Sequence, residues 1–148
     1  MKIYIASDHG GYELKKELAK YLQGKGYVIE DMGNKEPDPQ DDYPDFVLPL
    51  AEKVAKEIGA TGIILGRSGN GEAIAANKVK GIRAAVCLNV KMAKMAREHN
   101  DANILSLGAD YVDLDTAKVI ADTFLETFFS KEEKHKRRVN KITSYEPA

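Results

Sequence analysis

A glycine-rich loop with polar side chains is the stretch of this sequence best equipped for chemistry. It runs from Gly66 to Glu72 and follows the apolar run 61–65, which predicts a buried strand. Its three glycines allow backbone N–H groups to turn toward a bound oxyanion. Ser68 and Asn70 add hydrogen-bonding groups, and Glu72 adds a carboxylate at the end of the loop. The loop is therefore suited both to stabilise negative charge and to move a proton.

Familiar glycine loops differ from this one. A Walker phosphate loop ends in Gly-Lys-Ser/Thr, whereas Gly71 is followed here by Glu72. A serine-hydrolase elbow has a glycine two residues after the serine, where this chain has Asn70 after Ser68. The simplest alternative is a tight turn between a strand and a helix, with Glu72 favoured as an acid in the first helical turn. These residues alone leave the catalytic and the structural interpretation of Glu72 both open.

Two of the three histidines are predicted in loops next to strands. His9 follows the predicted strand 2–6, and His99 precedes the predicted strand 103–107. Such loops often carry function, which favours proton handling or anion binding over unconstrained surface histidines. A metal site is disfavoured because the histidines lack the short spacing of ligand pairs and the lone Cys87 has no cysteine partner.

The third histidine, His135, lies in a basic segment, 131–148, near the end of the chain. In the cluster 134–138, one lysine precedes it, and a lysine and two arginines follow it. A solvated charged face is the ordinary interpretation of such a cluster. A phosphate clamp is the functional alternative, because arginine forks match the geometry of phosphate oxygens.

Composition indicates one globular domain, 1–148, of ordinary type, with 43% hydrophobic and 30% charged residues. The net charge of −1 gives no reason to expect nucleic acid or a membrane as a partner. No apolar run approaches the roughly 20 residues of a membrane span. The first residues enter a predicted strand without the layout of a signal peptide, and a single cysteine suits a reducing compartment. We therefore expect a cytoplasmic protein.

Alternating strand and helix patterns predict a parallel sheet covered on both faces, that is, a three-layer α/β/α domain. Strands are expected at 2–6, 27–31, 61–65, 82–88 and 103–107, and helices at 12–23, 73–78, 89–98 and 114–129, with another that starts at 44 and is kinked at Pro49 or begins there. Loops at the carboxyl ends of parallel strands meet at one edge. We expect that edge to bring together Asp8, His9, the glycine loop with Glu72, His99 and Asn100.

A carboxylate base, an oxyanion cradle, histidines and a phosphate clamp suit proton transfer next to a carbonyl in a phosphorylated sugar. The base would remove a proton from C2 of an aldose while loop N–H groups hold the enediolate oxygens. The same acid would return the proton to C1 and give the ketose. Because such sugars are mostly closed rings, a second acid–base group must first open the ring.

Several longer motifs carry a resemblance to a known family. They are 7–15 (SDHGGYELK), 42–46 (DYPDF), 69–72 (GNGE), 74–78 (IAANK), 81–84 (GIRA) and 97–101 (REHND). Over nearly its whole length the sequence resembles the ribose-5-phosphate isomerase B family, which also includes galactose-6-phosphate and allose-6-phosphate isomerases. The resemblance implies a Rossmann-like sandwich around a five-stranded parallel sheet. It also implies a cytoplasmic homodimer, sometimes paired into a tetramer, without metal or cofactor and with active sites that share residues of both subunits.

The resemblance also implies residue roles. One branch of the family has a cysteine base where Gly66 stands here, and the other has glycine there and a glutamate base at the position of Glu72. This sequence is similar to the second branch, in which His99 would open the ring with Asp8 and Tyr43 nearby. Substrate contacts are then expected from the loop residues Gly66, Arg67, Gly69, Asn70 and Gly71, from Ser68 at the enediolate, from Asn100 at the sugar, and from His9, His135 and Arg138 at the phosphate.

Two positions depart from the pattern of the family. Lys134 and Asp110 stand where arginines are often found, and both affect the expected phosphate clamp. The sequence therefore leaves open whether the substrate is ribose 5-phosphate or a hexose 6-phosphate of the allose or galactose type. A non-catalytic phosphosugar-binding protein is a third interpretation, and Glu72 beside an intact glycine loop speaks against it.

Overall fold

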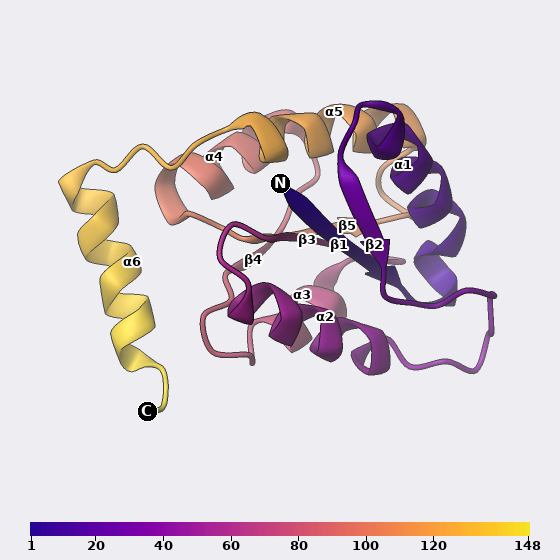
Figure 1. Ribbon diagram of the computed structural model, residues 1–148, viewed down its shortest axis with the longest axis horizontal. Helices are drawn as coiled ribbons and strands as arrows, with labels where there is room; N and C mark the ends of the chain where they lie inside the picture. The colour runs from indigo at the N-terminus through magenta and orange to yellow at the C-terminus, as the bar shows by residue number, and fades with distance from the viewer.

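A computed structural model describes residues 1–148, and a five-stranded parallel sheet forms its centre (Figure 1). The strands are β1 (Lys2–Ser7), β2 (Val28–Asp31), β3 (Thr61–Gly66), β4 (Ala84–Val86) and β5 (Ile104–Gly108). Their order across the sheet is β2-β1-β3-β5-β4, and every neighbouring pair is parallel. The three inner strands are almost wholly buried, as expected where helices cover both faces of a parallel sheet.

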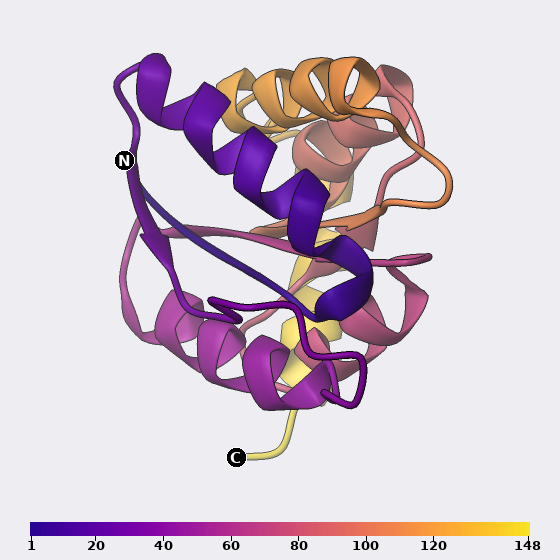
Figure 2. The same cartoon turned by 90° about the vertical axis from the view of Figure 1, so that its right-hand side faces the viewer.

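Five helices form the two outer layers. Helices α1 (Tyr12–Gly24), α4 (Val90–Asn100) and α5 (Leu114–Glu126) cover one face, and α2 (Pro44–Lys56) and α3 (Asn70–Ala76) cover the other, as Figures 1 and 2 show. Each layer encloses its own hydrophobic core against the sheet. Leu18 and Phe124 lie in the first core, and Leu50 and Ile64 lie in the second. The predicted three-layer, Rossmann-like α/β/α fold is confirmed.

The last helix, α6 (Glu133–Tyr145), lies apart from both layers at one side of the molecule (Figure 1). It packs beside α4 and buries only His135 and Val139. The sequence did not predict this helix, because two buried positions in a charged segment give little hydrophobic periodicity. No helix of the chain has both the length and the apolar character needed to cross a bilayer.

Several predicted boundaries differ from the structure. The helix after the glycine loop begins at Asn70, so Glu72 lies in its first turn instead of ahead of it. Helix α2 continues through Pro49, whose exposed position leaves the missing backbone hydrogen bond on the solvent side. Strand β4 has only three residues, 84–86, where 82–88 was expected.

Strand register determines which loops meet. Ser7 pairs with Leu65, and Gly66 pairs with Gly108, so the carboxyl ends of β1, β3 and β5 lie side by side. The loop after β1, the glycine loop after β3 and the turn after β5 therefore share one edge of the sheet. The opposite, amino edge receives the chain as it leaves each helix and enters the next strand.

Candidate active site

The glycine loop is fixed to the carboxyl edge by hydrogen bonds and close packing. Gly69 precedes α3 in a left-handed conformation with φ of 83°, which a residue with a side chain rarely adopts. The buried Ser106 hydroxyl donates to the Gly69 carbonyl at 2.7 Å. The Asn70 N–H donates to the Ser68 hydroxyl at 3.1 Å. The loop is therefore held in one shape before any ligand binds.

Glu72 is almost completely buried, with 4% of its surface exposed. Its carboxylate lies over Gly66, where the Cβ of any other residue would overlap with it. Burial raises the pKa of Glu72, and the nearby charge of Asp8 raises it further, while backbone N–H groups act in the opposite direction. A carboxyl group with a raised pKa both accepts and returns a proton readily near neutral pH.

The loop after β1 lies against the glycine loop. Asp8 is nearly buried and accepts a hydrogen bond from the Gly10 N–H at 2.9 Å. The Arg67 side chain packs over Gly10, where an added Cβ would come within 2.6 Å of Arg67 Cγ. On the other side of the loop the Tyr43 phenol lies against Gly71, since an added Cβ there would be 2.5 Å from its hydroxyl oxygen. Asp8, His9, Tyr43 and the loop thus form one crevice.

Asp41 and Asn34 also belong to this crevice, and the sequence did not predict either of them. Asp41 Oδ1 is 2.6 Å from His9 Nδ1 and accepts a hydrogen bond from the His9 backbone N–H at 3.1 Å. Asp41 Oδ2 accepts a hydrogen bond from Asn34 Nδ2 at 2.5 Å. Both residues belong to the polar loop 32–42, and no local pattern distinguishes Asp41 from the other acids of that loop.

The carboxylate and imidazole atoms of Asp8, His9 and Asp41 lie within 4.8 Å of one another. We assign no metal site to this group. The hydrogen bonds between His9 and Asp41, and from the Gly10 N–H to Asp8, already use these atoms.

The expectation that His99 and Asn100 share the crevice of the same chain is wrong. Both lie in the last turn of α4, which leads to the amino end of β5. Arg83, just before β4, donates from Nε to the Asn100 carbonyl at 2.9 Å, which places Asn100 beside that amino edge. The length of β5, roughly 16 Å, separates the two edges of the sheet. The error arose because the loop after a helix leads to the amino end of the next strand.

His135 is not a solvated residue of a charged face. It is 6% exposed, and its ring stacks on that of His99 with centroids 4.2 Å apart and planes 15° from parallel. Burial lowers the pKa of His135, and the charge of His99 lowers it further. Arg138 is exposed and adds positive charge next to this pair. The candidate residues therefore form two groups, one at each edge of the sheet.

Asp110 lies at the carboxyl edge, on the turn after β5. Its carboxylate is 3.8 Å from the Arg67 guanidinium, and both side chains are exposed. Lys134 pairs instead with Glu132 at 3.9 Å. Asp110 thus forms its ion pair with Arg67 of the glycine loop and not with a basic residue of α6.

A comparison with protein families identifies the chain. The ribose/galactose isomerase family model matches residues 3–142. The chain belongs to this family. Among its relatives, ribose-5-phosphate isomerase B of Mycobacterium tuberculosis is 41% identical over 146 residues, which cover 99% of this chain and 90% of the relative.

Solved structures of the ribose/galactose isomerase family match the fold closely. Ribose-5-phosphate isomerase B of Clostridium thermocellum is 51% identical with a TM-score of 0.90, covering 97% of this chain and 96% of that one. The enzyme of Mycoplasma genitalium, solved with bound ribulose 5-phosphate, is 41% identical with a TM-score of 0.94, covering 97% and 95%.

The one cysteine of the chain, Cys87, is not expected to take part in catalysis. Cys87 is wholly buried directly after β4, and burial raises its pKa to about 12, so it carries almost no thiolate at neutral pH. We expect Cys87→Ala to leave kcat unchanged and to cost about 1 kcal/mol of stability. Steady-state kinetics and urea unfolding check this. Loss of turnover in a folded Cys87→Ala protein would restore cysteine as a candidate base.

Proposed function

We propose that this protein interconverts ribose 5-phosphate and ribulose 5-phosphate through an enediolate, with Glu72 as the base. The observation that carries the proposal is the buried Glu72 carboxylate, which lies over Gly66 inside a loop rich in backbone amides. Its raised pKa suits a group that takes a proton from C2 and returns it to C1. The family match and the relative solved with bound ribulose 5-phosphate support this substrate.

The loop supplies the rest of the proton-transfer chemistry. As C2 loses its proton, negative charge develops on the oxygens at C1 and C2. Preorganised N–H groups of the loop and the Ser68 hydroxyl would stabilise that charge without having to reorganise. Asp8 contributes its charge near Glu72, which favours the protonated carboxyl that forms when Glu72 takes the proton from C2.

We place the protein in the glutamate-base branch of its family. The space directly over Gly66 is filled by the Glu72 carboxylate, so a cysteine side chain at position 66 would compete for the same volume. The glutamate at 72 therefore requires a glycine at 66, and this supports Glu72 as the base in place of a cysteine at 66.

We further propose that the active site is completed by a second copy of the chain. Ring opening by His99, sugar binding by Asn100 and phosphate binding by His135 and Arg138 all require these residues near Glu72. Within one chain they lie at the opposite edge of the sheet. A two-fold dimer would bring this group from one subunit to the crevice of the other, and would do so twice by symmetry.

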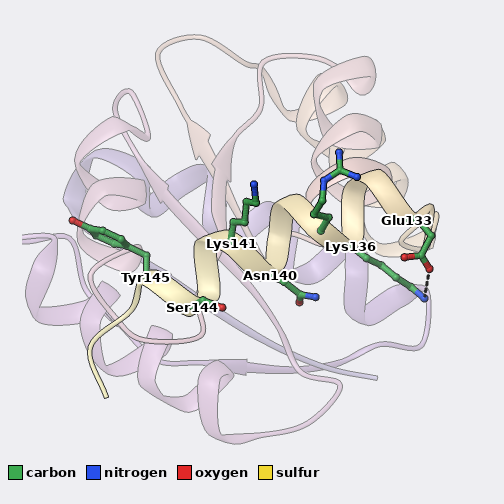
Figure 3. Close-up of a pocket in the computed structure, with 7 residues that line it drawn as sticks. Glu133, Lys136, Asn140, Lys141, Ser144 and Tyr145 are labelled. Carbon is green, nitrogen blue, oxygen red and sulfur yellow. Dashed lines mark ion pairs between the residues drawn. The ribbon is translucent and has the colours of Figure 1, made fainter.

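Helix α6 offers the surface for such a dimer. A hollow of about 840 Å³ runs along its outer side, lined by side chains from Glu133 to Tyr145, as Figure 3 shows. Tyr145, which lines this hollow, is 92% exposed in the single chain and is available for contact with a second copy. We propose only the two-fold contact that the site requires. A cytoplasmic location within pentose phosphate metabolism fits the unpaired, buried Cys87.

Isomerisation in D₂O of ribose 5-phosphate, allose 6-phosphate and galactose 6-phosphate tests the activity and the substrate together. We expect deuterium to enter ribose 5-phosphate at C2, detected by proton NMR, at a rate well above that of the hexose phosphates. Faster exchange of a hexose phosphate would assign the protein to that substrate. A non-catalytic phosphosugar-binding protein would bind a sugar phosphate but exchange none of the three.

A further inference from the structure

The crevice contains a buried carboxylate that the proposed proton transfer does not use. The Asp41 side chain is 8% exposed, and both of its oxygens accept hydrogen bonds. Oδ1 binds His9 twice, through the backbone N–H and through ring nitrogen Nδ1. A carboxylate can only accept hydrogen bonds, so the hydrogen on this side of the imidazole must be on Nδ1.

The position of Asp41 is itself fixed from the core. Lys15 is 1% exposed, and its ammonium group donates to the Gly33 carbonyl at 2.8 Å and to the Asn34 carbonyl at 2.6 Å. The Asn34 side chain, also buried, then donates from Nδ2 to Asp41 Oδ2. A chain of hydrogen bonds therefore runs from α1 to the ring of His9.

We infer that Asp41 is a positioning residue, which orients the His9 imidazole and keeps it doubly protonated so that Nε2–H can donate to the phosphate of the substrate. The inference rests on the proposed function, because His9 is useful as a cation only if the ligand is an anion. It assigns a role to a residue 32 positions away from His9 in the sequence.

Three charged groups face His9, one from each element around it. Asp41 comes from the loop before α2, Asp8 from the loop after β1 and Arg67 from the glycine loop. The hydrogen bond to Asp41 raises the pKa of His9, Asp8 adds to the rise, and Arg67 opposes it. The balance stabilises the imidazolium, which is the form that attracts a sugar phosphate carrying close to two negative charges.

The direction of the pH effect follows from this balance. A histidine with a raised pKa stays charged to higher pH, so phosphate binding weakens only when the pH rises past that value. Replacing Asp41 by asparagine removes the negative charge and lowers the pKa of His9. KM should then begin to rise at a lower pH than in the wild type, and the two proteins should have similar KM values below both pKa values.

The experiment compares Asp41→Asn with the wild type and with Asp38→Asn, a matched control. Asp38 lies in the same loop but is exposed, and its side chain accepts only from the Gln40 N–H. NMR titration of the free proteins should show that the pKa of His9 falls by about one unit in Asp41→Asn and stays constant in Asp38→Asn. KM for ribose 5-phosphate at pH above the wild-type pKa should rise about tenfold, more than kcat falls.

A double variant shows whether Asp41→Asn acts through His9 or by disturbing the structure of the site in general. If Asp41 acts through His9, then His9→Gln with Asp41→Asn should raise KM no more than His9→Gln alone. An unchanged pKa of His9 in Asp41→Asn would overturn the inference, as would a rise in KM that is equal at every pH.

Measurements on the unaltered protein keep the inference testable if Asp41→Asn does not fold. ¹⁵N spectra at high pH should show the remaining ring proton of neutral His9 on Nδ1, and a proton on Nε2 would contradict the role of Asp41. Inorganic phosphate should shift the His9 resonances of the wild type. This result does not depend on turnover, so a failure of the proposed isomerase activity would be recognised separately by the exchange assay in D₂O.

Discussion

Replacing Glu72 with glutamine is expected to lower kcat by about 10²–10⁴-fold, because the amide keeps the shape of the side chain but cannot accept a proton. The variant should fold, since a neutral group suits the buried site over Gly66 at least as well as a charged one. Deuterium exchange at C2 should disappear together with turnover. In the wild type, the acidic limb of the pH profile of kcat/KM should lie above the ordinary pKa range of a glutamate.

Glu13→Gln is the matched control for this variant. Glu13 is also a glutamate in the first turn of a helix, α1, but it is exposed. If Glu72 were only a favourable acid near a helix N-terminus, both variants would lose a few tenths of a kcal/mol of stability and no activity. A Glu72→Gln protein that keeps a third of the wild-type kcat would remove Glu72 from the role of base.

His99→Asn is expected to lower the turnover of ring-forming substrate by about 10²-fold or more, because an amide cannot shuttle a proton at neutral pH. A substrate that cannot cyclise should be affected much less. Equal losses on both kinds of substrate would show that His99 does not act in ring opening. The measurement is initial rates on ribose 5-phosphate and on an open-chain analogue.

The same variant tests whether active sites are shared between subunits. Mixing His99→Asn with Glu72→Gln, after reversible unfolding, should restore activity that neither variant has alone. In a two-fold dimer, half of the random pairs are mixed, and one of the two sites in each mixed dimer combines an intact Glu72 with an intact His99. The mixture should therefore reach about a quarter of the wild-type activity. No recovery in a mixture that contains mixed dimers would mean that sites are not built from both chains.

The arrangement of the sheet could be predicted because it depends on local patterns. Runs such as 61–65 are largely apolar, and each predicted strand lies within a few residues of the observed one. Glycine and serine at the end of β3 also indicated the loop that the structure places against Asp8 and Tyr43. These features need no knowledge of which distant residues meet.

The features that were missed depend on contacts between distant residues. Asp41 looks like any other acid of a polar loop until the fold places it against His9. His135 belongs to a cluster of charges, and only the packing of α6 beside α4 shows that it is buried on His99. His99 is a different case, because the order of elements was sufficient to place it: a residue between a helix and the parallel strand that follows lies at the amino edge of the sheet.

Because the Glu72 carboxylate lies over Gly66, a lineage cannot change from a glutamate to a cysteine base by one productive mutation. A cysteine introduced at 66 would overlap with the carboxylate and disturb the base already present. Loss of Glu72 before the cysteine arrives would leave no base at all. Either order passes through a poorly active ancestor, so the exchange needs two mutations selected together, and descendants should tend to inherit the base of their lineage unchanged.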